Sequence, residues 1–206
     1  MNRRTLLRLA LLPPLLAPFA ARAQGAPQST PQDAAGLLIS AIRDNNPVLY
    51  LESKYLYRRI QAPAPLSLDP VPIGSAKVVR EGTRVSLLTY SVGVHQGLEA
   101  AAELDSEGIS VEVVDLRTLV PLDVATIAAS VNKTSRAVVL HEDARRHGYG
   151  AEIAATVQDE CFWRLDGPVV RIAGKNTPIP TSPALEDAAV PQLPEIISTL
   201  RRVATT

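Results

Sequence analysis

Short apolar runs alternate with longer amphipathic stretches along the second half of the chain. The three successive pairs of run and stretch are residues 85–90 with 92–104, 110–115 with 124–131, and 137–141 with 151–165. Mainly apolar runs of this length are typical of strands buried on both faces, and the stretches have the spacing of amphipathic helices. Strands that alternate with helices predict right-handed crossovers and a largely parallel sheet. The pattern therefore predicts an α/β fold, a three-layer sandwich, over residues 76–206.

Weaker signals complete this domain at its two ends. Residues 72–82 lead into it and predict a short edge strand with a turn. The apolar run 169–172 predicts a further strand, and the spacing of apolar positions over 193–203 predicts a closing helix. The sheet should then be covered by helices on both faces, as crossover connections require.

A smaller unit precedes the domain. Apolar positions at helical spacing, with Thr30 as a cap and Pro31 in the first turn, predict a helix over 31–43. A turn at 44–47 follows. The apolar run 48–51 then predicts a strand that is buried on both faces.

A proline-rich segment separates the two units. Four prolines within residues 61–75 remove backbone donors and favour an extended linker between a unit at 29–60 and the domain at 76–206. A single strand at 48–51 has no partner strands nearby in the sequence. Its unpaired edges predict that the smaller unit is poorly soluble or depends on another chain.

The first 28 residues differ in kind from the rest. They open with basic residues, continue with an apolar run at 9–20, contain no acid, and include a small-x-small sequence at 21–23. Three interpretations stay open: a twin-arginine-like export signal, a mitochondrial presequence, or a mis-assigned start. The prolines and the short apolar run argue against a transmembrane helix, which needs roughly 20 apolar residues.

Composition and charge exclude some classes of partner and of chemical site. The chain has 206 residues, of which 46% are apolar, and its 21 basic and 21 acidic side chains give a formal charge of zero. Nucleic acid and anionic membranes are disfavoured as partners because both attract basic surfaces. Cys161 is the single cysteine, which excludes an internal disulfide and a zinc cluster of thiolates from this chain alone.

Two groups of polar residues could carry chemistry. His141, Glu142 and Asp143 end a predicted strand with His147 nearby, but adjacent strand residues point to opposite faces, which favours a structural or interface role over a metal site. The following loop contains Arg145, Arg146, Gly148 and Gly150 before a predicted helix. Backbone amides, the helix dipole and these arginines could bind an anion or a partner, although two glycines are more typical of a tight turn.

Asp115 and Arg117 stand at the end of another predicted strand. An ion pair or capping network that fixes the loop is favoured here over contact with a ligand. Asp123 is expected to cap the helix that follows.

Several segments resemble one enzyme family. They are residues 30–38 (TPQDAAGLL), 47–59 (PVLYLESKYLYRR), 113–123 (VVDLRTLVPLD) and 141–153 (HEDARRHGYGAEI). Together they resemble the β subunit of thiamine-diphosphate-dependent 2-oxo-acid dehydrogenases, over roughly residues 29–203. Residues 156–162 (TVQDECF) and 177–180 (TPIP) resemble its branched-chain, 2-oxoisovalerate type. The resemblance implies that 76–206 is a transketolase C-terminal domain and that 29–60 is the last part of a pyrimidine-binding domain.

The same resemblance implies cofactors, partners and sites. The complete assembly contains an α subunit, a second β subunit and a dihydrolipoyl acyltransferase core, and it uses thiamine diphosphate and magnesium. The family's catalytic residues come from the rest of the pyrimidine-binding domain, so no catalytic or cofactor-binding residue is expected in this chain. Ala41, Asp44 and Asn46 match part of a structural potassium site, and the end of a helix suits a cation.

The expected function is therefore assembly and docking within a 2-oxo-acid dehydrogenase of the 2-oxoisovalerate or pyruvate type, with no activity of the chain alone. One alternative is a stand-alone interaction module without enzymatic activity, which an exported leader would favour. Another is a regulatory domain that binds a small anion at residues 145–150. The resemblance implies a cytoplasmic location, and the leader leaves the periplasm and the mitochondrial matrix as alternatives.

Overall fold

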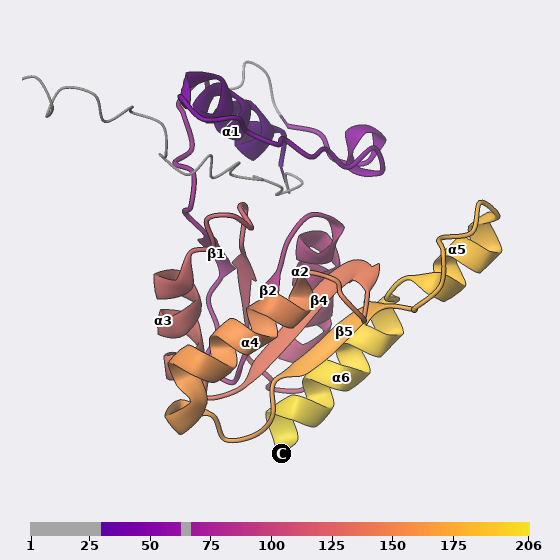
Figure 1. Ribbon diagram of the computed structural model, residues 1–206. Coiled ribbons are helices and arrows are strands. Elements are labelled where there is room, and N and C mark those ends of the chain that lie inside the picture. The colour runs from indigo at the N-terminus through magenta and orange to yellow at the C-terminus, as the bar shows by residue number, and fades with distance from the viewer. Residues whose placement is uncertain (1–29, 63–66) are drawn as a thin grey trace, which may run out of the picture.

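A five-stranded sheet lies at the centre of the fold (Figure 1). This computed structural model describes residues 30–62 and 67–206. The strands are β1 (Lys77–Arg80), β2 (Val85–Thr89), β3 (Val111–Asp115), β4 (Ala137–Ala144) and β5 (Val170–Gly174). Their spatial order is β1-β3-β2-β4-β5, with β1 antiparallel to β3 and every other neighbouring pair parallel. The predicted mostly parallel sheet with an edge strand at its start is confirmed.

Helices cover both faces of the sheet, so the predicted three-layer α/β architecture is also confirmed. The helices of the domain are α2 (Val92–Asp105), α3 (Val124–Thr134), α4 (Gly150–Cys161), α5 (Pro183–Ala189) and α6 (Leu193–Thr205). Helices α2 and α6 pack on one face against side chains such as Leu87 and Val113. Helices α3 and α4 pack on the other face against Leu88 and Val114. Successive side chains of one strand thus lie in two separate apolar layers, because side chains alternate between the two faces of a sheet.

The boundaries of the predicted helices shift for local reasons. Helix α3 begins after Asp123, whose side chain accepts a hydrogen bond from the backbone N–H of Thr126 at 3.0 Å, so this residue is the predicted cap. Helix α4 ends at Cys161 and a short 3₁₀ turn, Phe162–Arg164, continues it toward the expected end at residue 165. Helix α5 was not expected, and it stands away from the sheet (Figure 1).

The N-terminal unit contains α1 (Pro31–Arg43) and a 3₁₀ turn, Leu56–Arg58. The predicted strand at 48–51 is wrong. Only an isolated bridge forms at Val48, and Leu49 and Leu51 are exposed. An apolar run is buried on both faces only where neighbouring strands and covering layers exist, and the described residues supply neither beside it. Residues 67–72 of the predicted linker form no helix or strand and lie along α1, where the hydroxyl of Ser40 donates to the carbonyl of Val71 at 2.6 Å. The extended conformation of the linker stays a prediction.

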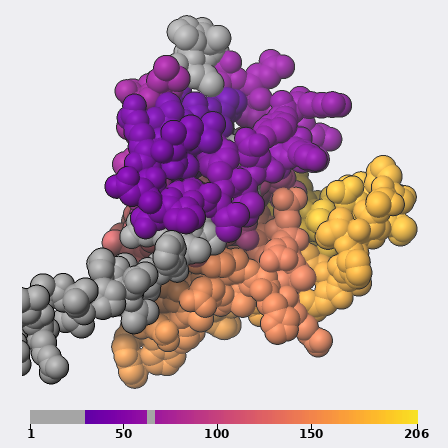
Figure 2. Space-filling view, turned by 45° about the horizontal axis from the view of Figure 1, so that its top comes forward, coloured from indigo at the N-terminus to yellow at the C-terminus, as the bar shows by residue number. Residues whose placement is uncertain are grey.

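One buried ion pair joins this unit to the domain. A guanidinium nitrogen of Arg117, beyond the end of β3, lies 2.5 Å from a carboxylate oxygen of Asp33 on α1, and both side chains are largely buried. The N-terminal unit therefore lies over the edge of the sheet at which the parallel strands end (Figures 1 and 2). Within the described ranges, no helix is long and apolar enough to cross a membrane.

Candidate functional site

The carboxyl ends of the parallel strands form the first candidate site. His141 lies on β4 at this edge and is buried, whereas its neighbour Glu142 is exposed. The expected opposite orientation of adjacent strand residues is therefore observed. Neither ring nitrogen of His141 has a hydrogen-bond partner among the described residues. His147 is exposed and lies within the turn that follows β4. No three His, Cys, Asp or Glu side chains of the described ranges are grouped to hold a metal ion.

The imidazole of His141 explains why the next turn contains glycines. A Cβ atom on Gly150 would overlap Cδ2 and Nε2 of His141, and a Cβ on Gly148 would overlap the carbonyl oxygen of Ala144. The ring therefore packs directly against the first turn of α4. Packing gives the Gly148-Tyr149-Gly150 sequence a structural reason that requires no bound anion.

Electrostatics at this edge disfavour additional charge. Burial lowers the pKa of His141, and Arg171 and Arg145 lower it further, while Asp143 acts in the opposite direction. Burial also raises the pKa of Tyr90, an effect that Asp143 reinforces. Although Glu142 is exposed as a residue, neighbouring atoms remove part of the water around its carboxyl group, and this desolvation, followed by the charge of Glu186, raises its pKa. In each case poor solvation favours the uncharged form: neutral imidazole for His141, and the protonated side chain for Tyr90 and Glu142.

The loop predicted to bind an anion or a partner is fixed to β5. The backbone N–H of Arg145 donates to the carbonyl of Gly174 at 2.9 Å, and the backbone N–H of Arg146 donates to the side-chain oxygen of Asn176 at 2.8 Å. The guanidinium of Arg145 donates to the backbone carbonyl of Arg171 at 2.8 Å, and the guanidinium of Arg171 donates to the backbone carbonyl of Arg145 at 2.9 Å. The side chains of Arg145 and Arg146 are exposed. Anion or partner binding at this loop stays a prediction.

The residues matched to a potassium site lie at the end of α1. Asp44 follows the helix, and its Oδ1 accepts hydrogen bonds from the backbone N–H and the side-chain amide of Asn46, both at 2.8 Å. One oxygen of the Asp44 carboxylate is thus engaged in a local turn. The partial potassium site at Ala41, Asp44 and Asn46 stays a prediction.

The second strand end has the capping contact that was expected and a different ion pair. The backbone N–H of Arg117 donates to Oδ1 of Asp115 at 3.1 Å, which fixes the loop after β3. The guanidinium of Arg117 instead pairs with Asp33. Since Arg117 has a φ of 55°, this backbone bond holds an uncommon conformation for a residue with a Cβ.

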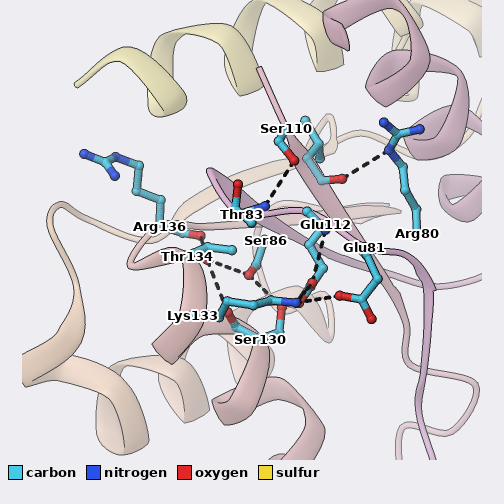
Figure 3. A network of polar contacts seen from close by, with 12 residues as sticks. Arg80, Glu81, Thr83, Ser86, Ser110, Glu112, Ser130, Lys133, Thr134 and Arg136 are labelled. Atoms are coloured by element: carbon cyan, nitrogen blue, oxygen red, sulfur yellow. Dashed lines mark hydrogen bonds and ion pairs between the residues drawn. The ribbon is translucent and has the colours of Figure 1, made fainter. Parts of the chain in front are cut away.

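A polar network at the opposite, amino edge of the sheet could not be assigned from the sequence pattern (Figure 3). Glu112 on β3 is fully buried and forms an ion pair with Lys133 of α3, and Lys133 also lies 2.7 Å from Glu81. The backbone N–H of Gly82 donates to Glu112 at 3.3 Å. Glu112 first, and Glu81 second, raise the pKa of Lys133. A lone glutamate inside an apolar strand was the available signal, but its partner on a distant helix was not.

Three hydroxyl groups extend this network. The hydroxyl oxygen of Ser86 on β2 lies 2.6 Å from that of Ser130 and 2.7 Å from that of Thr134, and all three side chains are buried. The hydroxyl of Thr134 is also within reach of the carbonyl of Arg136, at 3.1 Å. The network satisfies its polar atoms internally, and this is typical of a structural rather than a reactive site.

Exposed apolar surface marks two other regions. A groove of about 360 Å³ lies on the N-terminal unit and is lined mainly by apolar side chains, among them Ala34, Leu38, Leu56 and Ile60. At the end of α4, Trp163 is 91% exposed and packs edge-on against Phe162, with ring centroids 4.8 Å apart. Apolar side chains exposed to this degree are typical of surfaces that contact another molecule.

Comparison with known proteins agrees with this architecture. Residues 74–196 match the family described as Transketolase, C-terminal domain. The chain is 47% identical to the β subunit of the pyruvate dehydrogenase E1 component of Bacillus subtilis, over 85% of this chain and 54% of that protein. It is 44% identical to the β subunit of acetoin:2,6-dichlorophenolindophenol oxidoreductase of Cupriavidus necator, over 84% of this chain and 51% of that protein.

Further similarities have the same extent. The mitochondrial pyruvate dehydrogenase E1 subunit beta-2 of Oryza sativa is 48% identical, over 83% of this chain and 46% of that protein. A solved structure of a split-gene transketolase, described as an inactive β4 tetramer, superposes with a TM-score of 0.73 at 23% identity, covering 89% of this chain and 58% of that one. The chain spans about half the length of the curated relatives it matches.

Proposed function

Since the chain belongs to the transketolase C-terminal domain family, we propose that it is a β-subunit component of the decarboxylating enzyme of a 2-oxo-acid dehydrogenase. The observation that carries this proposal is the identity of 44–48% to three β subunits over more than four fifths of the chain. The match includes the N-terminal unit as well as the domain, because the domain alone is shorter than the matched length.

The role of this chain in such an assembly is to provide contact surfaces. Thiamine diphosphate and magnesium would lie between the α subunit and the rest of the pyrimidine-binding domain, outside the residues described. Their chemistry is decarboxylation of the 2-oxo acid followed by acyl transfer to lipoamide. The exposed apolar side chains of the N-terminal unit and of the Phe162–Trp163 pair support contacts with an α subunit, a second β subunit or an acyltransferase core.

The substrate is proposed to be a short 2-oxo acid. Residues 156–162 and 177–180 favour 2-oxoisovalerate, whereas two of the relatives named above are pyruvate dehydrogenase subunits. The two segments that resemble the 2-oxoisovalerate type lie at the end of α4 and before α5, and many of their side chains are exposed. Pyruvate is the better supported of the two, because the identity to these relatives extends over more than four fifths of the chain. The cytoplasmic location stays a prediction.

The test is reconstitution with a purified α subunit and acyltransferase core. We expect the chain to co-elute with the α subunit in size-exclusion chromatography with light scattering, and to show no turnover of pyruvate or 2-oxoisovalerate when alone. Isothermal titration should detect no saturable binding of thiamine diphosphate and magnesium to the isolated chain. Saturable binding there would refute the division of roles proposed above.

A non-enzymatic interaction module is the second candidate. The exposed Leu49 and Leu51 of the N-terminal unit favour a chain that requires some partner, whichever protein that is. Failure of the folded chain to bind the α subunit would favour this candidate over the first.

A further inference from the structure

His141 combines deep burial with unpaired polar atoms. It is 1% exposed, yet neither Nδ1 nor Nε2 has a hydrogen-bond partner among the described residues. A buried imidazole in this situation is stable in its neutral form, because the charged form would lose its hydration and gain no hydrogen bond. The protonation state of His141 therefore matters to the structure around it.

The ring lies at a joint between two elements. On one side, the backbone of β4 pairs with β5 at His141 opposite Ala173, and the register then shifts before Ala144. On the other side, the ring fills the space left by the missing side chain of Gly150, in the first turn of α4. The position of this turn, and of the arginine loop before it, thus depends on the ring staying in place.

The charged and titratable groups around the ring come from each neighbouring element. Asp143 of β4 favours the protonated ring, whereas Arg145 of the loop and Arg171 of β5 oppose it. Burial raises the pKa of Tyr90, after β2, and of Tyr149, before α4. Tyrosine side chains are uncharged in acid, so neither contributes charge to the ring there. The positive end of the α4 dipole also opposes a second positive charge.

We propose that His141 is an acid-sensitive latch between β4 and α4. In its neutral form the ring holds the first turn of α4 against the sheet. After it gains a proton, the ring must move toward water or toward Asp143 to be solvated, and either movement withdraws it from Gly150. Acid then loosens residues 145–153 while the sheet stays folded, and it changes the surface that this edge offers to a partner.

The direction of the pH effect follows from the pKa of His141. In the unfolded chain a histidine titrates at about 6.5, and in the folded chain the pKa of His141 is lower. Between the two values the unfolded chain binds more protons. The stabilising contribution is therefore complete above about pH 6.5 and is lost as the pH falls, at most about tenfold in the folded-to-unfolded ratio per pH unit.

The first experiment compares the full chain with His141→Asn and with His147→Asn as a matched control. His147 is exposed, and its positive φ of 63° is one that asparagine tolerates. Urea unfolding at pH 7.5, 6.5 and 5.5 should show that the wild-type chain and the His147 variant lose stability in acid more steeply than the His141 variant, by up to about tenfold in the folded-to-unfolded ratio per pH unit. A His141→Asn variant with the wild-type slope would overturn the proposal.

A second measurement decides the question even if that variant does not fold. Proton NMR of the wild-type imidazole gives its pKa, and hydrogen exchange, corrected for intrinsic rates, reports opening of residues 151–154 with α6 as internal reference. We expect a pKa below 6.5 and a loss of protection in α4 that follows the same titration. A pKa at or above 6.5, or protection in α4 that does not change with the titration, would contradict the latch.

Discussion

Buried polar side chains have hydrogen-bond or ion-pair partners at the amino edge of the central sheet, whereas His141 at the carboxyl edge has none among the described residues. At the amino edge, the carboxylate of Glu112 is fully buried but paired with Lys133, and the hydroxyl of Ser86 has two hydroxyl neighbours. At the carboxyl edge, the buried imidazole of His141 has no hydrogen-bond partner among the described residues. The first edge is closed by its own contacts. At the second edge, the imidazole of His141 is held by packing against Gly150 rather than by a hydrogen bond.

This difference indicates which edge can change. A satisfied polar network rigidifies the elements that it joins, because each member would leave an unpaired buried group if it moved. An unpaired group held by packing has no such penalty for moving. The carboxyl edge is also where the N-terminal unit and the arginine loop lie, so the adjustable edge coincides with one of the two surfaces proposed for partners, that of the N-terminal unit.

The largest expected effect is at the carboxyl edge. Gly150→Ala should destabilise the chain by about 3 kcal/mol, because its Cβ would overlap the packed imidazole of His141. Without that overlap the same change would favour the helix by up to about 1 kcal/mol. Urea unfolding measures the difference, with Gly167→Ala as the control, since no heavy atom lies within 4 Å of a Cβ placed there.

A companion variant shows whether the ring is the cause. His141→Ala combined with Gly150→Ala should be less destabilised than the sum of the two single changes, because the shortened side chain leaves room for the new Cβ. Strict additivity would mean that the ring and the glycine are not coupled, and the contrast between the two edges would then lose its basis.

The next effect is at the amino edge. Lys133→Met should cost about 2 kcal/mol, because it leaves the buried carboxylate of Glu112 without its partner. The expected cost is below the 3–5 kcal/mol typical of fully buried pairs, since the Lys133 side chain is 40% exposed. Thermal and urea unfolding provide the measurement. Glu81→Gln removes only the exposed partner of Lys133 and should leave stability nearly unchanged.

A smaller effect is expected from the hydroxyl group in the same network. Ser86→Ala should cost about 1 kcal/mol, the usual net value of a buried hydrogen bond, because Thr134 keeps the carbonyl of Arg136 as a partner. Ser198→Ala removes an exposed hydroxyl that bonds to a helix carbonyl and serves as the control. Equal losses in the two variants would show that the amino-edge network adds nothing beyond ordinary solvent-exposed bonds.

The smallest effect is expected at the surface. Arg201 and Glu107 form an exposed ion pair at 2.5 Å, which lowers the pKa of Glu107 and raises that of Arg201. Glu107→Gln should leave the midpoint of urea unfolding almost unchanged, because solvent and salt screen exposed pairs. A midpoint shift as large as that of Lys133→Met would mean that burial does not set the order of these effects.

Much of the domain fold was predictable because its strands are buried on both faces. Residues 85–90, 110–115 and 137–141 are apolar runs with helical segments between them, and the crossover rule then leaves few arrangements. The run at 48–51 has the same composition and forms no strand. Composition reports a tendency to be buried, whereas burial itself depends on partner strands that are absent from the described residues.

The buried polar contacts were less predictable for a related reason. The sequence places Asp115 beside Arg117, and their backbone contact is present, but the guanidinium reaches Asp33, 84 residues away in the chain. The Lys133 and Glu112 pair likewise joins two elements that are adjacent only in the folded sheet. The glycines near His141 were visible in the sequence, and their reason appears only when the ring is placed against them.

Native-state hydrogen exchange of the full chain at pH 7 tests the contrast between the two edges most directly. The account predicts that amides of β2 and β3 exchange only through global unfolding, with the same dependence on urea as the unfolding of the whole domain. Amides in the first turn of α4 should exchange through a smaller opening that depends little on urea. Exchange of both groups through one common opening would contradict the claim that the carboxyl edge is the adjustable one.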